Sequence, residues 1–401
     1  MAKQNKPAIR FKGFTDAWEQ RKLGDCFTER CESMPDGELI SVTINDGIKK
    51  FSELGRHDNS NDDKSKYKKV CAGDIAYNSM RMWQGASGCS PYEGIVSPAY
   101  TVLTPNSGIN SKCMAYQFKL PATIHTFKIN SQGITSDNWN LKFPALSEIE
   151  IYVSPYEQEQ AKIAAYFANL DHLITLHQRK FDKLQVLKKA MLEKMFPKNG
   201  SSVPEIRFKG FTDAWEQRKL GEVVKEVTRN DPTSEAPIMM ITANNGFIEQ
   251  SERYAFDNAG ESLKKYILLQ KGELAYNHGA SKLRPFGSCF ALTTAESARI
   301  PFVYHCFSAE NQNAEFLSIE LNGSEVESQL RKIVSSGARM DGLLNISFDE
   351  YSTVTVLLPD IKEQEHIADF FRNLDHLITL HQRELEKLQN IKKSMLEKMF
   401  V

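Results

Sequence analysis

Residues 159–196 and 363–400 carry the same long helical pattern, so one segment is present twice in the chain. In the first copy, apolar residues recur at steps of three and four through Ile163, Phe167 and Leu170, and the second copy repeats the pattern. Neither copy contains Gly or Pro, and prolines lie just outside both. Each copy therefore predicts one uninterrupted amphipathic helix of about 37 residues, roughly 55 Å long.

An isolated amphipathic helix of this length would leave its apolar stripe in water. The pattern therefore predicts that the two copies pack on each other as an antiparallel coiled-coil rod, related by a pseudo-two-fold axis. In the alternative arrangement, each copy buries its stripe against its own globular half of the chain.

A second repeat precedes each globular half, because the sixteen residues Ile9–Gly24 return unchanged as Ile206–Gly221. Asp16 followed by Glu19 resembles a capping box and predicts a short helix at this point. The repeat also concentrates aromatic residues, which either anchor the start of each globular half or form a subunit interface that is used twice. These candidate partner-binding residues are Phe11, Phe14, Trp18, Phe208, Phe211 and Trp215.

We call the sixteen-residue repeat the head repeat. Between it and the long helix lies a variable body, residues 25–155 in the first half and 222–359 in the second. Both bodies contain short alternating runs typical of strands, and each closes on an apolar strand, 149–153 or 354–358. We predict helices at 121–131 and 324–335, the second beginning with a capping box formed by Ser324 and Glu327 and each followed by a glycine, Gly133 or Gly337. Each body should therefore be a mixed α+β domain.

These patterns divide the chain into four parts. The predicted boundaries are 1–155 for the first globular domain, 156–197 for the central helix, 198–359 for the second globular domain and 360–401 for the C-terminal helix. The segment from Pro197 to Pro204 is the one clear linker between domains.

Composition narrows the possible functions. The 50 Lys and Arg residues and 51 Asp and Glu residues give a net charge of −1, so any nucleic-acid binding would depend on locally segregated cations. Seven cysteines without a C-x-x-C pair predict reduced thiols and no metal site. The N-terminus has no signal-like apolar region and no run is long enough to span a membrane, which predicts a cytoplasmic location without membrane contact.

Motifs of common catalytic sites are also missing. The chain contains no phosphate-binding G-x-x-x-x-G-K-[ST] loop, no G-x-G-x-x-G after a strand, and neither H-E-x-x-H nor G-x-S-x-G. No tetrad that would hold a flipped base is present either. We therefore predict no catalytic residue in this chain.

The repeats and their motifs resemble the DNA-specificity subunit of type I restriction-modification systems over the whole chain. The resemblance rests on the head repeat, on the turns Gly73–Asn78 and Gly272–Asn277, on Gly94–Tyr100, and on the E-Q-x-x-I-A-x-x-F pattern that opens each long helix. The second body departs from the family pattern at Ala298–Val303, so the strand register there is not set by the motif.

The resemblance implies a non-catalytic subunit with two target-recognition domains in tandem, separated by two long antiparallel helices. Each domain would read one half of a split double-stranded DNA target. Two modification subunits, which bind S-adenosylmethionine and methylate adenine, and two ATP-dependent restriction subunits would bind this chain. S-adenosylmethionine, ATP and Mg are thus expected in the partners, and no cofactor is expected in this chain.

Candidate base-reading residues follow from side-chain chemistry, since Arg and Lys suit guanine whereas Asn and Gln suit adenine. In the first body the candidates are Asn78, Arg81, Gln84, Ser136 and Asn138. In the second body they are Asn277, His278, Lys282, Arg284 and Arg339. For each, a solvated loop position or a phosphate contact is the alternative. For the whole chain, the alternatives are a rod-shaped protein–protein scaffold and a stand-alone split-site DNA binder.

Overall fold

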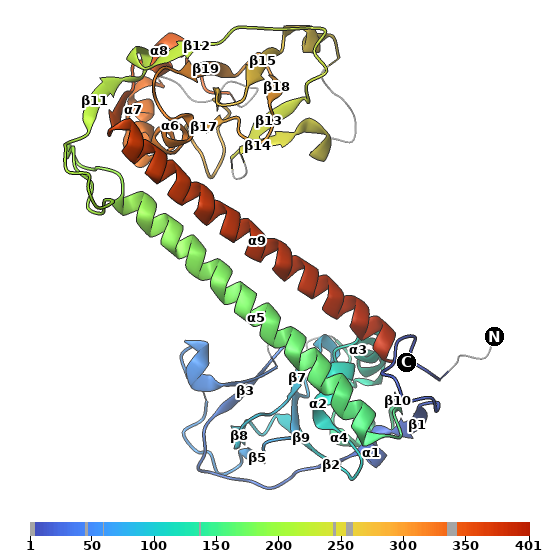
Figure 1. Ribbon diagram of the computed structural model, residues 1–401. Helices are drawn as coiled ribbons and strands as arrows, with labels where there is room; N and C mark the ends of the chain where they lie inside the picture. Colours follow the sequence, from blue (N-terminus) through green and yellow to red (C-terminus); the bar gives the residue numbers. More distant parts are fainter. Residues whose placement is uncertain are drawn as a thin grey trace. The chain divides into compact units, whose positions relative to one another are not determined.

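The computed structural model describes residues 5–44, 47–58, 60–135, 138–243, 246–253, 260–334 and 343–401. It divides into two compact units, one made of Met1–Arg179 with Gln382–Val401 and the other of Lys180–His381 (Figure 1). Both long helices, α5 (Glu157–Lys194) and α9 (Ile361–Met399), pass from one unit into the other. Each unit therefore contains one globular body together with a part of each long helix, whereas the four-part division predicted from the sequence keeps bodies and helices apart.

The first unit alternates short strands and helices before α5. Its elements are β1 (Glu19–Lys22), α1 (Leu23–Cys26), β2 (Phe27–Glu29), β3 (Ile40–Thr43), β4 (Gly47–Lys50), η1 (Phe51–Leu54), β5 (Lys68–Val70), β6 (Ile75–Asn78), η2 (Met82–Gln84), β7 (Ser87–Cys89), β8 (Gly94–Val96), β9 (Tyr100–Pro105), α2 (Ser111–Gln117), α3 (Pro121–Asn130), α4 (Phe143–Ser147) and β10 (Glu150–Val153).

The second unit follows the same plan before α9. Its elements are β11 (Glu216–Lys219), η4 (Leu220–Glu222), β12 (Val224–Glu226), β13 (Met239–Thr242), β14 (Gly246–Glu249), η5 (Gln250–Glu252), η6 (Gly260–Lys265), β15 (Ile267–Gln270), β16 (Leu274–Asn277), β17 (Ser288–Ala291), β18 (Ser297–Ile300), β19 (His305–Ala309), α6 (Ala314–Leu321), α7 (Ser324–Ile333), α8 (Phe348–Ser352) and β20 (Thr355–Leu358).

The strand order is the same in both bodies. A four-stranded antiparallel sheet has the order β2-β9-β6-β7 in the first unit and β12-β19-β16-β17 in the second, and the described residues of each unit add three two-stranded sheets. The mixed α+β class predicted for each body and the closing strands β10 and β20 are therefore confirmed.

The register that the sequence left open at Ala298–Val303 is the register of the first body. Strand β8 pairs with β5 so that Val96 lies opposite Lys68, and β18 pairs with β15 so that Ile300 lies opposite Ile267. In each body the middle residue of this strand, Ile95 or Arg299, also forms a parallel bridge to an earlier segment. Backbone pairing thus preserves the frame although the G-I-V-S-P-A-Y motif is absent.

Two predicted capping boxes are wrong. Residues 15–18 form no helix, because Glu19 begins a strand paired with β10 and the Asp16 carboxylate accepts a hydrogen bond from the Tyr156 hydroxyl. Helix α7 starts one residue too early for the predicted box, with Gly323 as its N-cap, so Ser324 is already helical. Helix α8 begins with a capping box between Ser347 and Glu350, which was not predicted from the sequence.

The glycine that follows α3 does not cap it. The helix ends in extended backbone at Ser131, and Gly133 lies further on with φ 144°. A Cβ atom at Gly133 would lie 2.6 Å from the carbonyl oxygen of Asn138, so only glycine allows the loop to close this tightly. Gly337, proposed to follow the second helix, is outside the described residues.

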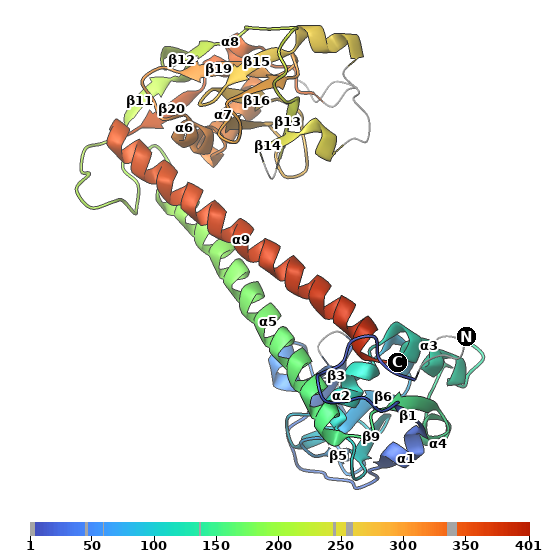
Figure 2. The same ribbon diagram turned by 45° about the vertical axis from the view of Figure 1, so that its right-hand side comes forward.

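Within each unit, the first turns of one long helix pack beside the last turns of the other (Figures 1 and 2). In the first unit, Ile163 and Phe167 of α5 share a core with Met399 of α9, and Lys392 bonds Asp171 at 2.5 Å. In the second unit, the equivalent pair is Lys188 and Asp375, also at 2.5 Å. The predicted packing of the two helices on each other is thus confirmed within each unit.

The alternative prediction, in which each long helix packs against its own globular half, also holds for part of each helix. The first turns of each helix are buried against the body of their own unit. Phe167 is fully buried beside Trp18 and Cys113 of the first body. No helix among the described residues combines the length and apolar character needed to cross a membrane.

Candidate nucleic-acid interface

In the first unit, the candidate readers follow strand β6. A turn at Gly73, which has φ 96°, leads into this buried strand, and the chain turns again after Asn78. The Asn78 side chain accepts a hydrogen bond from the Met80 backbone N–H at 3.0 Å, and its carbonyl oxygen accepts one from Arg81 at 2.9 Å. These bonds fix the turn and leave the side chains of Arg81 and Gln84 exposed at the surface.

A second loop, described over residues 131–135 and 138–140, lies against this turn. The backbones of Gln132 and Asn140 bond to each other at 2.9 and 2.8 Å, and the Leu141 N–H donates to the Ser79 carbonyl at 2.9 Å. Asn138 is exposed in this loop, so the structure brings Asn78, Arg81, Gln84 and Asn138 to one region. We call residues 78–85 together with residues 131–135 and 138–140 the first loop pair. Ser136 lies outside the described residues.

Two tryptophans that were not among the predicted base-reading residues join the first loop pair. The rings of Trp83 and Trp139 meet edge to face with centroids 5.2 Å apart, and the Lys128 ammonium lies 5.4 Å from the centre of the Trp139 ring. Edge-to-face aromatic pairs add roughly 0.5–1.5 kcal/mol beyond the area they bury. The signal in the sequence was the position of two of the four tryptophans in polar loops beside candidate readers.

The second unit builds a corresponding loop pair, residues 277–287 and 343–346. The Asn277 side chain accepts a hydrogen bond from the Gly279 N–H at 2.9 Å, which repeats the bond between Asn78 and Met80, and donates to the Ile241 carbonyl at 3.1 Å. Gly279 bridges to Leu343. Lys282 is exposed. The same strand end therefore presents a different set of side chains.

Two candidates of the second body are turned inward. His278 is 7% exposed, and its ring nitrogens lie 2.7 Å from the Leu344 carbonyl oxygen and 2.6 Å from the Val303 carbonyl oxygen, so neither is available to a base in this structure. Arg284 is half-buried, donates to the Asn322 carbonyl at 2.9 Å, and has its pKa lowered by burial. Both residues hold the loop to the body. Arg339 lies outside the described residues.

The aromatic residues of the head repeats lie where each body meets the long helices. We call this region of each unit the joint. Trp18 is 3% exposed and packs edge to face on Phe400 at 5.9 Å, and Trp215 is 2% exposed and packs on Phe196 at 5.8 Å. The four phenylalanines, Phe11, Phe14, Phe208 and Phe211, are half-buried against the first turns of α5 or α9, and Phe14 also against Tyr156 just before α5. Burial of the tryptophans supports their role as anchors, whereas partner contact by the phenylalanines stays a prediction.

A buried ion pair locks each joint. Arg10 binds both oxygens of Glu159 at 2.7 and 2.8 Å, and Arg207 binds both oxygens of Glu363 at 2.7 Å. Burial raises the pKa of Glu159, but hydrogen bonds from Arg10 and Ser154 outweigh it and hold the pKa below its usual value. The identical head repeats are therefore explained by the same bidentate ion pair in both joints.

Comparison with known proteins agrees with this architecture. Residues 15–186 match the family described as the type I restriction modification DNA specificity domain. The chain is 23% identical over 362 residues to the type I restriction enzyme MjaVIII specificity subunit of Methanocaldococcus jannaschii, covering 83% of this chain and 81% of that protein. The crystal structure of the type I restriction-modification S subunit from M. genitalium shares the fold, with a TM-score of 0.60, 14% identity and 99% of each chain covered.

The fold repeats one topology in two domains, and each domain ends in a loop pair. Residues 15–186 match the type I restriction modification DNA specificity domain, and the chain as a whole is similar to type I specificity subunits.

Proposed function

We propose that this chain is the non-catalytic specificity subunit that reads a split DNA target, with one half-site read by each recognition domain. The observation that carries the proposal is that one topology occurs twice and ends in two loop pairs with different side chains. Side chains at the end of a common strand can differ freely because they are exposed and pack on little else. Two such surfaces suit two different base sequences.

The chemistry of the exposed side chains agrees with reading in the major groove. Arg81 and Lys282 can pair with guanine, and Asn138 and Gln84 with adenine. Arg339 and Ser136 are retained as candidates on sequence grounds alone. His278 and Arg284 act through the position of the loop that carries Lys282.

The proposed partners are two modification subunits, which would bring S-adenosylmethionine, and two restriction subunits, which would bring ATP and Mg. The proposal assigns this chain no cofactor and no catalytic residue. The half-buried Phe11, Phe14, Phe208 and Phe211 are the proposed contacts for the modification subunits, because the two sets lie in equivalent joints and would present the same surface twice.

An exchange of bodies tests the proposal. Residues 222–359 are replaced by the second body of another specificity subunit, and the methylated sites are mapped in cells that also carry the modification subunit. The expected result is a new second half-site beside an unchanged first half-site. A change in both half-sites, or in neither, contradicts modular reading. A chain that shows no salt-dependent affinity for duplex DNA would instead favour the protein scaffold.

A further inference from the structure

Helices α2 and α6 carry different aromatic residues at the two joints. Helices α2 and α6 begin with Asn110 and Asn313 as N-caps, whose side chains both accept from the third residue that follows. The two helices are thus offset by 203 residues (313 minus 110), which places Ile319 where the first unit has Tyr116.

Tyr116 has three partners in the first unit. Its hydroxyl donates to the Asp171 carboxylate at 2.7 Å, its ring centre lies 5.1 Å from that of Phe167, and the Lys392 ammonium lies 5.8 Å from its ring centre. Burial raises the pKa of Tyr116, so the phenol keeps the proton that it donates. This position therefore selects a phenol ring by stacking, by a cation and by a charged acceptor.

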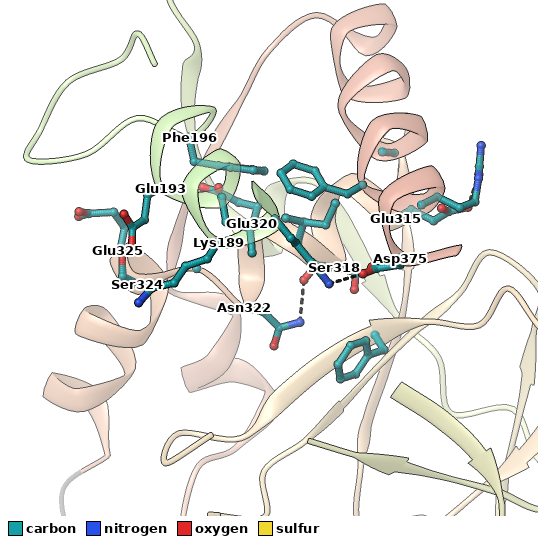
Figure 3. Close-up of a pocket in the computed structure, with 18 of the residues that line it drawn as sticks. Lys189, Glu193, Phe196, Glu315, Ser318, Glu320, Asn322, Ser324, Glu325 and Asp375 are labelled. Atoms are coloured by element: carbon teal, nitrogen blue, oxygen red, sulfur yellow. Dashed lines mark hydrogen bonds and ion pairs between the residues drawn. The ribbon is translucent and has the colours of Figure 1, made fainter. Parts of the chain in front are cut away.

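The second unit keeps all three partners but not the ring. A cavity of about 750 Å³ is lined by Asp375, Phe371 and Lys188, and Ile319 is also part of its lining. Figure 3 shows the cavity, with Asp375 labelled. The Lys188 ammonium bonds Asp375 at 2.5 Å, as Lys392 bonds Asp171. The volume is within the range of small-molecule sites, roughly 300–1,000 Å³.

The aromatic residue that α6 carries in place of Cys113 does not line this space. Phe316, which replaces Cys113 of the first unit, stacks on Phe196 with ring centres 5.8 Å apart and is not part of the cavity lining. Phe196 and Phe371 form apolar walls, whereas Arg372 and Glu315 form a charged rim at which they bond each other at 2.8 Å. The space is thus apolar at its ring-binding wall and polar where a ring substituent would emerge.

We propose that this cavity binds a para-substituted phenol, with its ring on Phe371 and its hydroxyl donating to Asp375. The ligand takes the place that Tyr116 fills in the first unit. Two sources share this chemistry, a free phenol and a tyrosine side chain of another protein. A hydrogen bond to a charged group makes the hydroxyl worth tenfold or more in affinity over the bare ring.

Titration of the full chain with 4-methylphenol tests the site. The isoleucine methyl groups are labelled with carbon-13, and the Ile319 signal is identified with the conservative variant Ile319→Val. The expected result is a saturable shift of the Ile319 methyl signal, with toluene binding at least tenfold more weakly. No shift at Ile319, or equal affinity for toluene, would overturn the proposal.

Two variants provide matched controls. Ile319→Tyr supplies the ring from the chain itself and should lower the affinity for 4-methylphenol at least tenfold, whereas Tyr116→Ile should open a second site and raise the stoichiometry from one to two. Unchanged affinity in a folded Ile319→Tyr chain contradicts the proposal, and the methyl titration of the unmodified chain decides if the variants do not fold.

N-acetyl-tyrosine methylamide distinguishes the two sources of the ligand. Binding as tight as that of 4-methylphenol identifies a tyrosine side chain, whereas weaker binding identifies a free phenol.

Discussion

The joints and the loop pairs are two regions of each unit with opposite behaviour. At the joints, bidentate ion pairs of nearly the same length and a buried tryptophan recur in both units. At the loop pairs, the backbone turn recurs but the first unit uses two tryptophans where the second uses a buried histidine. A joint must pack the body on two helices in one fixed geometry. A reading surface needs only a fixed backbone turn, and the exposed side chains on that turn can vary.

The joints also differ in the hydrogen bonds that their buried carboxylates accept. Glu159 also accepts hydrogen bonds from Ser154 at 2.5 Å and from the Trp18 indole at 3.3 Å, whereas among the described residues Glu363 receives side-chain bonds from Arg207 alone. Removal of the arginine should therefore leave the buried carboxylate of the second unit with fewer hydrogen-bond donors than that of the first.

The largest effect is expected for Arg207→Ala. An uncompensated buried Glu363 should lower the free energy of unfolding by about 3–5 kcal/mol. Arg10→Ala should cost less, because Glu159 keeps two donors. Urea unfolding, with amide hydrogen exchange to assign the loss to one unit, measures both. The double variant Arg207→Met with Glu363→Leu is the control and should lose less than Arg207→Ala. Equal losses at the two joints would show that the extra donors contribute nothing.

A pH dependence is expected from Glu320 of the second unit, which replaces Gln117 of the first. Burial raises the pKa of Glu320 to about 7, and its carboxylate accepts one backbone hydrogen bond, from Leu357. Because the pKa is raised in the folded state, the stability present near pH 4.5 is lost as the pH rises through 7. Glu320→Gln should thus raise the free energy of unfolding at pH 8 by up to about 3 kcal/mol, with a gain that shrinks towards pH 5.

The matched control for this pH dependence is Gln117→Glu in the first unit. Gln117 is 3% exposed and donates to the Tyr152 carbonyl at 2.8 Å, so a carboxylate there would lose a donor and be buried. This variant should lower stability at pH 8 more than at pH 5. Parallel stability curves for Glu320→Gln and the unmodified chain between pH 5 and 8 would argue against a titrating Glu320.

Arg81→Ala and Lys282→Ala should separate the two reading surfaces. If each side chain reads a base edge, its loss should cost ~1–3 kcal/mol at one base pair of its own half-site and leave the other half-site unchanged. Binding to a panel of single-substituted duplexes at fixed salt measures the effect. Uniform weakening on all duplexes would assign the side chain to a phosphate. Arg339→Ala belongs in the same panel.

The smallest effect is expected for the tryptophan pair of the first loop pair. Trp139→Ala removes an edge-to-face contact worth roughly 0.5–1.5 kcal/mol and should weaken discrimination at the first half-site only. Trp139→Phe keeps a ring beside Trp83 and should retain most of the discrimination. If both variants read the first half-site as the unmodified chain does, the pair has no part in positioning the loops.

The sequence alone determined the repeated plan of the protein. The period of the apolar residues in 159–196 and 363–400 predicted two long helices, since only a helix places such positions on one face. The alternation after Gly73 and Gly272 predicted strands β6 and β16. Both signals are local, and the structure confirms them.

Only the tertiary structure decided what individual side chains do. Asp16 and Glu19 fit a capping box, yet strand pairing with β10 is formed in its place. His278 and Arg284 have the chemistry of base readers, but contacts with Leu344 and Asn322, which are distant in sequence, bury them. The opposite holds for Trp83 and Trp139, which meet across more than fifty residues of chain. Burial and side-chain pairing depend on which segments meet in space, and a short-range sequence pattern does not predict those contacts.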